Sequence, residues 1–465
     1  MFRSGLSARL AASFVAGAVM LCARAAAVDS LPQAPQPTAS PAVTNSPAPA
    51  ITLNQAMALA VQNDPAFATA RAAAGSARLD AAISRSALLP NAGANGIYTY
   101  TQPSGFVDTG VPYGLQHLPV FVANDSVHEY WAQLLVNQTI SLPNIANWRR
   151  ARAVAGQASA DLESARRDLL VRVVAAYFGV IDTAEKAAVA QRALNEAQSF
   201  VDLTQKLEKG REVAHADVVK ADLSLQQRRR EFADATLAAE KARLDLGVLL
   251  FPDPRTPYTL ADQNQTPAPL PDEATVQAAA AQNNPDLRGA LSAVRAAQNE
   301  VWAARLAYLP TIGLNYTYGI NAPELAANSP GGVRNLGYSA SVTVNVPLWD
   351  WFATQNKVRQ SQLRERAVQA TLTNTQRLLI AQLDEYYGEA RVAADQVASL
   401  QTSVDTARES LHLTRLRYSA GEALALEVVD AQNQLAQAET ALADGRLRAE
   451  VARANLQTLT GVLSQ

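Results

Sequence analysis

The chain is short of the side chains on which most enzyme and metal chemistry depends. Among 465 residues it has one cysteine, Cys22, and four histidines that lie far apart. No spacing of these residues matches a zinc or redox motif, and no glycine-rich phosphate loop follows a predicted strand. The sequence therefore predicts no catalytic, cofactor-binding or metal-binding residue, and we do not expect an enzyme.

The chain also lacks an excess of one charge. Lysine and arginine number 40 and aspartate and glutamate number 42, so the formal net charge is −2. Proteins that bind nucleic acid usually carry a concentrated basic patch, and none stands out here. Nucleic acid is therefore not expected as a partner.

The N-terminal apolar stretch is too short for a convincing transmembrane helix. Arg3 and Arg9 precede apolar residues 10–23, and three alanines then offer a cleavage site. This arrangement predicts a secretory signal peptide over residues 1–27. Cys22 would be removed with it, and the alternative is a lipid-anchored Cys22.

Proline is concentrated in two segments and missing from two long ones. Residues 28–50 predict a disordered leader rich in proline and alanine, and residues 252–273 predict a proline-rich connector. No proline occurs in residues 144–251 or from residue 348 to the C-terminus. Apolar residues in these long segments keep the 3-4 spacing of a coiled-coil seam, which predicts long helices.

About half of the mature sequence is a repeat of the other half. Residues 62–65, Gln-Asn-Asp-Pro, recur at residues 282–285 as Gln-Asn-Asn-Pro, and later landmarks recur at slightly shorter offsets. The first repeat is predicted over residues 51–251 and the second over residues 274–465. Each would form the same structural unit, in the order helix, strand pair and long helical hairpin.

The hairpin that ends each repeat is unusually long. The first is predicted over residues 147–249 with a break at Gly210, and the second over residues 352–460 with a break at Gly421. One helix over residues 147–207 would span roughly 90 Å at 1.5 Å per residue. Because no ordinary soluble domain needs such helices, we expect a rod, a filament or a tunnel.

Four segments change from the helical period to a period of two. The predicted strands cover residues 94–101 and 130–142 in the first repeat and residues 311–320 and 338–346 in the second. The first pair is rougher, because Gly96 and Gln138 fall on the apolar face. One apolar and one polar face is typical of a membrane barrel strand, although a half-buried strand of a soluble sheet alternates equally well. The flanking long helices offer no second sheet to pack on, which favours the membrane.

Aromatic residues also favour the membrane. Trp148, Trp349 and Trp351 follow the strand ends, where an interfacial girdle belongs. The residues predicted to face lipid are Tyr98, Leu134, Val136, Leu314, Tyr316, Tyr318, Val342 and Val344.

A sheet in lipid must close, because its backbone groups find no other hydrogen-bond partners there. Four strands are too few for a barrel, since the smallest single-chain barrels have about eight. Two, three or four copies of the chain would supply eight, twelve or sixteen strands. The strand pattern does not choose among these.

Several motifs together resemble the TolC-like outer membrane efflux protein family. Residues 417–421, Arg-Tyr-Ser-Ala-Gly, are followed by residues 426–432, Leu-Glu-Val-Val-Asp-Ala-Gln. The family has the same Tyr-x-x-Gly turn, an acidic residue six positions on and an Asp-Ala pair. The junctions Tyr-Leu-Pro at 308–310 and Val-Pro-Leu at 346–348 are also similar to those of the family. The likeness covers both repeats and nearly all of the mature chain.

The resemblance implies a homotrimer with a twelve-stranded barrel in the Gram-negative outer membrane, in contact with its lipid. It also implies a long α-helical coiled-coil tunnel with a large periplasmic portion. The implied function is passive export of small molecules from an inner-membrane pump, proton-driven or ABC, through a periplasmic adaptor (membrane fusion protein). A type I protein-secretion duct has the same architecture. The alternative of a different class is a periplasmic structural coiled-coil protein.

In the family the tunnel narrows at the hairpin tips, which also contact the adaptor. The tip positions carried over by motif are Gly210, Asp217, Tyr418, Gly421, Glu427 and Asp430. The chain departs from the family pattern at Ala423, where some members have arginine. The first repeat has Lys220 where the second has Asp430, and its turn is predicted to be one residue longer.

Overall fold

The structure is a computed structural model that describes residues 50–101, 106–107, 118–119, 128–261, 270–329, 332 and 334–460, without the side chains of residues 106–107 and 118–119. The described residues belong to one compact unit, Pro49–Gln465. The predicted signal peptide, Cys22 and all of the leader except Ala50 lie outside the described residues. No described helix is both long enough and apolar enough to cross a membrane.

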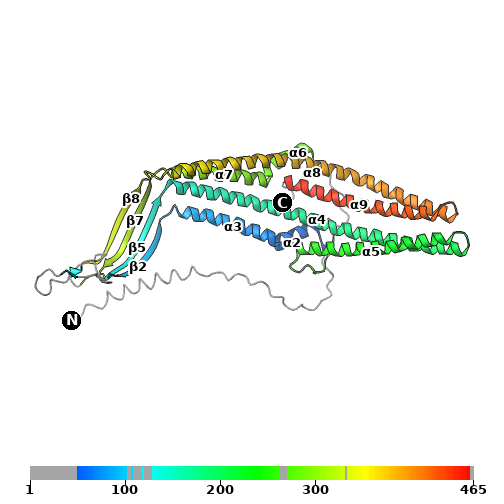
Figure 1. The fold of residues 1–465 in the computed structure, drawn as a ribbon, viewed down its shortest axis with the longest axis horizontal. Coiled ribbons are helices and arrows are strands. Elements are labelled where there is room, and N and C mark those ends of the chain that lie inside the picture. The colour runs from blue at the N-terminus through cyan, green and yellow to red at the C-terminus, as the bar shows by residue number, and fades with distance from the viewer. Residues whose placement is uncertain are drawn as a thin grey trace, which may run out of the picture. The chain divides into compact units, whose positions relative to one another are not determined.

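A four-stranded antiparallel sheet lies at one end of the long helices (Figure 1). Its strands are β2 (Asn91–Tyr100), β5 (His128–Ile140), β7 (Thr311–Ala322) and β8 (Leu336–Asn345), in the order β2-β5-β7-β8. Every strand end lies within three residues of its predicted position. The differences arise because pairing, and not alternation alone, sets where a strand begins, as when Asn91 pairs with Asn137. A short ladder joins β3 (Phe106–Val107) to β4 (Leu118–Pro119) between the first two strands.

The described residues of each repeat form four helices. Those of the first are α2 (Leu53–Asn63), α3 (Pro65–Ser86), α4 (Leu142–Lys209) and α5 (His215–Leu250). Those of the second are α6 (Glu273–Asn283), α7 (Pro285–Leu306), α8 (Ala353–Ser419) and α9 (Ala425–Thr460). The helices next to the sheet pack side by side, α3 on α4, α4 on α7 and α7 on α8. This is the order of the strands to which they connect, β2-β5-β7-β8.

The repeated Gln-Asn-Asp/Asn-Pro motif separates two helices in each repeat. The Asp64 carboxylate accepts the Phe67 N–H at 2.7 Å, and the Asn284 side chain accepts the Leu287 N–H at 2.9 Å. The proline that follows is the first residue of the next helix. Proline lacks an N–H group, but an N–H at this position would have no hydrogen-bond partner within the helix. The motif therefore ends one helix and caps the next at the same residue.

The first long helix begins at Leu142 and not at residue 147 as the sequence predicts. Pro143 lies in its first turn, a position that tolerates proline because the first N–H groups of a helix are unpaired. Ser141 is the single residue between β5 and α4. In the second repeat the helix begins at Ala353, after a longer connection.

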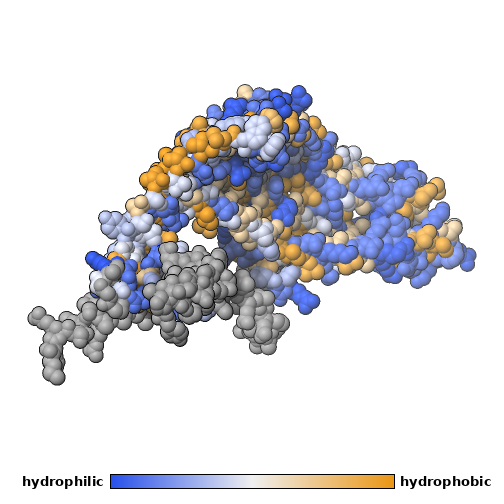
Figure 2. All heavy atoms as spheres, turned by 60° about the vertical axis from the view of Figure 1, so that its left-hand side comes forward, coloured by the Kyte–Doolittle hydropathy of each residue, from blue (hydrophilic) through white to orange (hydrophobic). Residues whose placement is uncertain are grey.

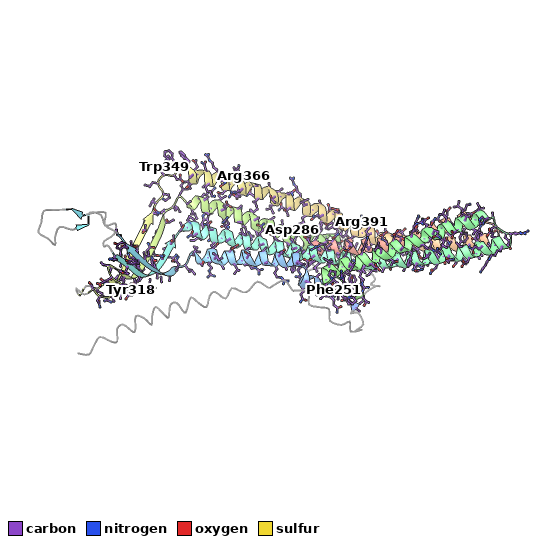
Figure 3. All side chains as sticks on the ribbon, turned by 60° about the horizontal axis from the view of Figure 1, so that its bottom comes forward. Phe251, Asp286, Tyr318, Trp349, Arg366 and Arg391 are labelled. Atoms are coloured by element: carbon purple, nitrogen blue, oxygen red, sulfur yellow. The ribbon has the colours of Figure 1, made fainter. Side chains whose placement is uncertain are left out.

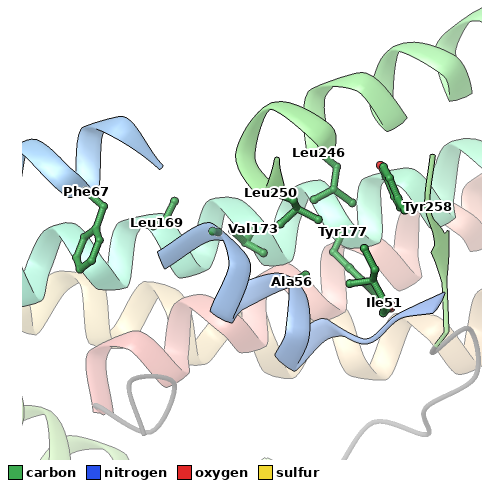
Figure 4. Close-up of a cluster of buried hydrophobic side chains, with 10 residues drawn as sticks. Ile51, Ala56, Phe67, Leu169, Val173, Tyr177, Leu246, Leu250 and Tyr258 are labelled. Carbon is green, nitrogen blue, oxygen red and sulfur yellow. The ribbon is translucent and has the colours of Figure 1, made fainter. Parts of the chain in front are cut away.

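A buried cluster joins α2 to α4 and α5 (Figure 4). Within it the buried Tyr177 donates its hydroxyl hydrogen bond to the Ile51 carbonyl at 3.1 Å. Tyr258 and Arg243 exchange two hydrogen bonds through their side chains and carbonyls, at 2.7 and 2.9 Å. Burial raises the pKa of Tyr258 to about 12. The strand β6 (Thr259–Leu260) of the connector pairs in parallel with β1 (Ala50–Ile51), so the junction between repeats is fastened to this cluster.

Candidate functional site

The register of the sheet sorts its residues into two chemically different faces. Directly paired residues of an antiparallel sheet project to the same side. Leu134 pairs with Tyr318, and Val136 pairs with Tyr316. Leu314 of β7 pairs with Val342 of the next strand, β8. All eight residues predicted to face lipid share this face, and each is at least 38% exposed.

The opposite face is mostly polar and carries few charges. One rung crosses all four strands as Asn91, Asn137, Asn315 and Ser341. The neighbouring positions add mostly threonine, serine and glycine, with Ile97, Trp131 and Leu135 as apolar exceptions. Such a surface is suited to water and to polar solutes.

Hydrophobic residues gather along the outside of the arch at the sheet end of the molecule (Figure 2). The hollow beneath it is lined more by hydrophilic residues (Figure 2). The two sides of the arch therefore differ in hydropathy (Figure 2).

Gln138, like His128 at the other end of β5, is a polar residue on the apolar face, and its contacts explain its presence there. Its Nε2 donates a hydrogen bond to the Leu88 carbonyl at 3.1 Å and another to the Thr139 carbonyl at 3.3 Å. The side chain therefore ties β5 to the turn that follows α3. Its Oε1 is buried and has no hydrogen-bond partner among the described residues.

The sheet has two free edges. Within the described sheet β2 pairs only with β5, and β8 pairs only with β7. The outer backbone groups of both edge strands are thus available to another strand. A closed sheet needs partners for both edges, and a second copy of the chain offers the complementary edge.

The two hairpins turn in the same way, which corrects one prediction. The Glu212 N–H bonds to the Leu207 carbonyl at 2.9 Å, and the Glu422 N–H bonds to the Arg417 carbonyl at 2.8 Å. The turns are therefore equal in length, and the predicted extra residue in the first turn is wrong. The positions of Gly210 and Gly421 suggested turns of unequal length because the two glycines occupy different positions of the turn.

The left-handed position of the first turn is Arg211, with φ 64°, and that of the second is Gly421, with φ 79°. Gly210 has an ordinary helical φ of −73°. An arginine in the left-handed region is strained, whereas glycine is not. The first turn thus holds a strain that the second lacks.

The structure places Tyr418 inside the hairpins and not on their surface. It is 3% exposed, its ring lies 5.2 Å from that of Phe200, and its hydroxyl donates to Thr204 Oγ1 at 3.4 Å. Burial raises the pKa of Tyr418, and the neighbouring Asp217 raises it further. Tyr418 therefore joins the second hairpin to the first near their tips.

The tip carboxylates differ in how firmly they are held. Glu427 accepts the Leu424 N–H at 3.1 Å and forms an ion pair with Arg417 at 3.5 Å. Asp217 lies 4.0 Å from Lys220. Asp430 is exposed and has no ion-pair partner among the described residues. Asp430 is therefore the least restrained of the three.

Ion pairs that the sequence did not predict hold the hairpins together. Arg192 of α4 pairs with Glu439 of α9 at 2.9 Å, and Arg446 of α9 pairs with Glu185 of α4 at 3.3 Å. Further pairs join Arg415 to Glu196 and Lys186 to Asp444. The partners are more than 200 positions apart in sequence, so no local pattern could have revealed them.

A groove of about 550 Å³ lies between α4, α8 and α9 in the same region. Leu203, Leu411 and Leu435 line it together with the paired arginines. Gln432 also lines it, is buried, and has a side-chain N–H group without a partner among the described residues. The groove therefore offers an apolar surface with charged edges.

The three predicted interface tryptophans lie close to the sheet but differ in exposure. Trp148 is half-buried in the second turn of α4, whereas Trp349 and Trp351 are exposed in the connection between β8 and α8. Among the described residues no group of three or more histidine, aspartate and glutamate side chains could hold a metal ion.

A family model described as outer membrane efflux protein matches residues 56–250 and 276–462, which fall in the two repeats. The protein CyaE of Bordetella pertussis is 27% identical over 298 residues, which are 61% of this chain and 60% of that protein. The match therefore spans less than two thirds of CyaE. The alkaline protease secretion protein AprF of Pseudomonas aeruginosa is 23% identical over 419 residues, 88% of this chain and 84% of that protein.

Solved structures share the fold at low sequence identity. The outer membrane protein VceC of Vibrio cholerae superposes with a TM-score of 0.76 at 17% identity, covering 88% of this chain and 96% of VceC.

Proposed function

This chain belongs to the outer membrane efflux protein family, and on that premise we propose that three copies of it form the exit duct of a tripartite efflux system. The duct lies in the outer membrane and extends far into the periplasm. It passively releases small molecules that an inner-membrane pump, proton-driven or ABC, delivers through a periplasmic adaptor.

One observation carries the proposal. A four-stranded sheet with an apolar face and two free edges continues into helices that keep the same lateral order. Joining β8 of one copy to β2 of the next in three copies gives twelve strands, within the range of known membrane barrels. The apolar face would then contact lipid, and the polar face would line the lumen.

The adaptor is proposed to bind at the hairpin tips, in the groove between α4, α8 and α9. Its apolar floor and paired charges suit a helical partner with leucine-like and charged residues at i and i+3 or i+4. The ion pairs between hairpins would then sit beside the bound adaptor.

The tip carboxylates are proposed to line the periplasmic opening of the duct and to control which ions pass through it. In three copies Glu427 and Asp430, which share one helix face, would form two stacked acidic rings, with Asp217 nearby. Like charges that converge on a narrow pore attract cations and repel one another. Because Glu427 is partly neutralised by Arg417, most of the effect should come from Asp430.

We expect Glu427→Ala with Asp430→Ala to raise single-channel conductance and weaken cation preference, while assembly stays intact. Planar-bilayer recordings in a salt gradient measure both quantities. The matched control, Glu240→Ala with Asp245→Ala, removes the same charge from exposed positions of α5 far from the tip. An unchanged reversal potential and conductance in the tip variant would show that these carboxylates do not line the gate.

Protein secretion is the second candidate, because AprF, named for alkaline protease secretion, aligns with 88% of this chain. The two functions predict different phenotypes of a strain that lacks the chain. Loss of efflux would raise sensitivity to small toxic compounds, whereas loss of secretion would remove specific proteins from the medium. A neighbouring gene for a proton-driven pump or for an ABC transporter also separates them.

A further inference from the structure

The connection between β8 and α8 has an unusual backbone. Trp351 and Phe352 are consecutive and both left-handed, with φ 52° and φ 64°. Bulky side chains rarely adopt this conformation, and such residues cluster where the conformation serves a function. The first repeat has a single residue, Ser141, in the corresponding place. The longer connection is therefore a feature of the second repeat alone.

The backbone of this connection turns large apolar side chains away from the protein. Leu348 is 89% exposed, Trp349 64%, Trp351 81% and Phe352 57%. The Trp349 ring meets those of Trp351 and Phe352 edge to face, at centroid distances of 5.6 and 5.3 Å. These four residues are called the aromatic loop below. Its three rings pack on one another, Leu348 is almost fully exposed, and the described residues do not bury any of the four.

Two cations follow the aromatic loop in the first turns of α8. Lys357 and Arg359 are exposed, and neither has an ion-pair partner among the described residues. Arg364, one turn further, is by contrast paired with Glu300 at 2.7 Å. Helical side chains lean toward the N-terminus, so the two free cations reach back toward the aromatic loop.

The spacing along α8 limits which cations can act with the loop. Arg359 lies seven residues after Phe352, a rise of roughly 10 Å, and Arg366 lies a further seven residues on. Trp349 and Arg366 lie on the same outer edge of the molecule (Figure 3). Arg366 and the still more distant Arg377 therefore offer the same charge on the same helix but farther from the loop.

The order of these groups matches the layers of a bilayer. Val342 and Val344 of β8 are apolar and exposed, the aromatic loop follows, and the cations come next. Hydrocarbon, interface and headgroups succeed one another in this order, with tryptophan at the interface and lysine or arginine at anionic headgroups. From this order we propose that the aromatic loop with Lys357 and Arg359 binds the headgroup of an anionic phospholipid in the periplasmic leaflet.

The proposal rests on the proposed function, since it requires the sheet to span the membrane. The phosphate of the lipid would contact Arg359, and its upper acyl region would lie against Trp349 and Trp351. Lys357 lies two residues before Arg359 and therefore on another side of α8, from which it adds positive charge at the same headgroup level. A neutral phospholipid would gain the aromatic contacts but little from the cations. Asp350 lies between the two tryptophans, where its carboxylate accepts the Thr354 N–H at 2.8 Å. The two cations outnumber this carboxylate, so the site selects for negative headgroup charge.

Tryptophan quenching by brominated lipids tests this in the full chain. The trimer is reconstituted in phosphatidylethanolamine vesicles that contain a minor share of brominated phosphatidylglycerol or, in parallel, of brominated phosphatidylethanolamine. We expect stronger quenching by the brominated phosphatidylglycerol. Lys357→Gln with Arg359→Gln should weaken the preference for phosphatidylglycerol by roughly ten-fold or more, since each cation near the surface contributes separately.

Two controls fix the assignment. Arg366→Gln with Arg377→Gln removes the same charge farther along α8 and should keep the preference. Trp349→Phe with Trp351→Phe should remove the difference between the two lipids and leave only the quenching of the remaining tryptophans, among them Trp148, which assigns the preference to the loop.

Three results would overturn the inference. The first is equal quenching of the unaltered chain by both lipids, and the second is an equal loss of preference in both charge variants. The third is loss of the trimer in Lys357→Gln with Arg359→Gln alone, which would mean that these cations contact a neighbouring copy. Conductance of the same vesicles separates the two proposals: a conducting trimer without lipid preference refutes the lipid site, whereas an unaltered chain that does not conduct refutes the duct.

Discussion

Lysine at Tyr316 or Val342 is expected to deplete the assembled protein from the outer membrane, whereas lysine at Asn315 or Thr343 should be tolerated. The first two residues share the apolar face of the sheet, and the last two share the polar face. Each residue of the apolar face is compared with an adjacent residue of its own strand, Tyr316 with Asn315 in β7 and Val342 with Thr343 in β8, so the position along the strand is closely matched.

The expected difference is large because lipid offers a lysine no hydrogen-bond partner. At the midplane of a membrane barrel a lysine on the lipid face costs about 2–4 kcal/mol, and a trimer would carry three of them. A lysine that faces the lumen stays in water and changes mainly the charge of the pore. Substitution by lysine should therefore have a large effect on the apolar face and a small effect on the polar face.

The amount of folded trimer in the outer-membrane fraction measures the effect, by its change of gel mobility on heating. Tyr316→Lys and Val342→Lys should leave little heat-modifiable trimer, and Asn315→Lys and Thr343→Lys should leave near-normal amounts. Equal tolerance on both faces would mean that the strands have been assigned to the wrong environments.

Gly319→Ala is expected to destabilise the sheet between β5 and β7. A Cβ atom added at Gly319 would lie 2.2 Å from the Ala132 carbonyl oxygen and 2.6 Å from the Gln133 Cα. Both obstacles are backbone atoms of the paired strand, so the strands themselves must move apart. Overpacking of this kind typically costs about 1–3 kcal/mol in each chain, and the proposed trimer would incur that cost three times.

Gly337→Ala is the matched control for this substitution. Gly337 pairs directly with Gly319 on the next strand, and nothing lies within 4 Å of a Cβ atom added there. The temperature at which the folded trimer dissociates should fall for Gly319→Ala and change little for Gly337→Ala. Similar temperatures for the two variants would show that the close approach of β5 and β7 is not a constraint.

The parts of the fold with a strong local period could be predicted from the sequence. Alternation located all four strands, because one apolar face leaves a signal at every second residue. The absence of proline located the hairpins, although Pro143 hid the first turn of α4. Proline interrupts a helix interior but is tolerated in its first turn, and the sequence alone did not distinguish the two situations.

Contacts between distant segments could not be predicted. Tyr418 packs against Phe200 and Thr204 of the other hairpin, and Gln138 bonds to the carbonyl of Leu88. The sequence around each of these residues contains no pattern that identifies its distant partner. The first turn was predicted one residue too long for a different reason, since its left-handed residue is Arg211 and not a glycine as in the second turn.

The mass of the assembled protein in mild detergent tests the central claim most directly. The claim is that one chain supplies a third of a closed sheet, through the free edges of β2 and β8. Native mass spectrometry of the purified outer-membrane protein should give three times the mass of the mature chain. A monomer, or an assembly of two or four copies with eight or sixteen strands, would contradict it.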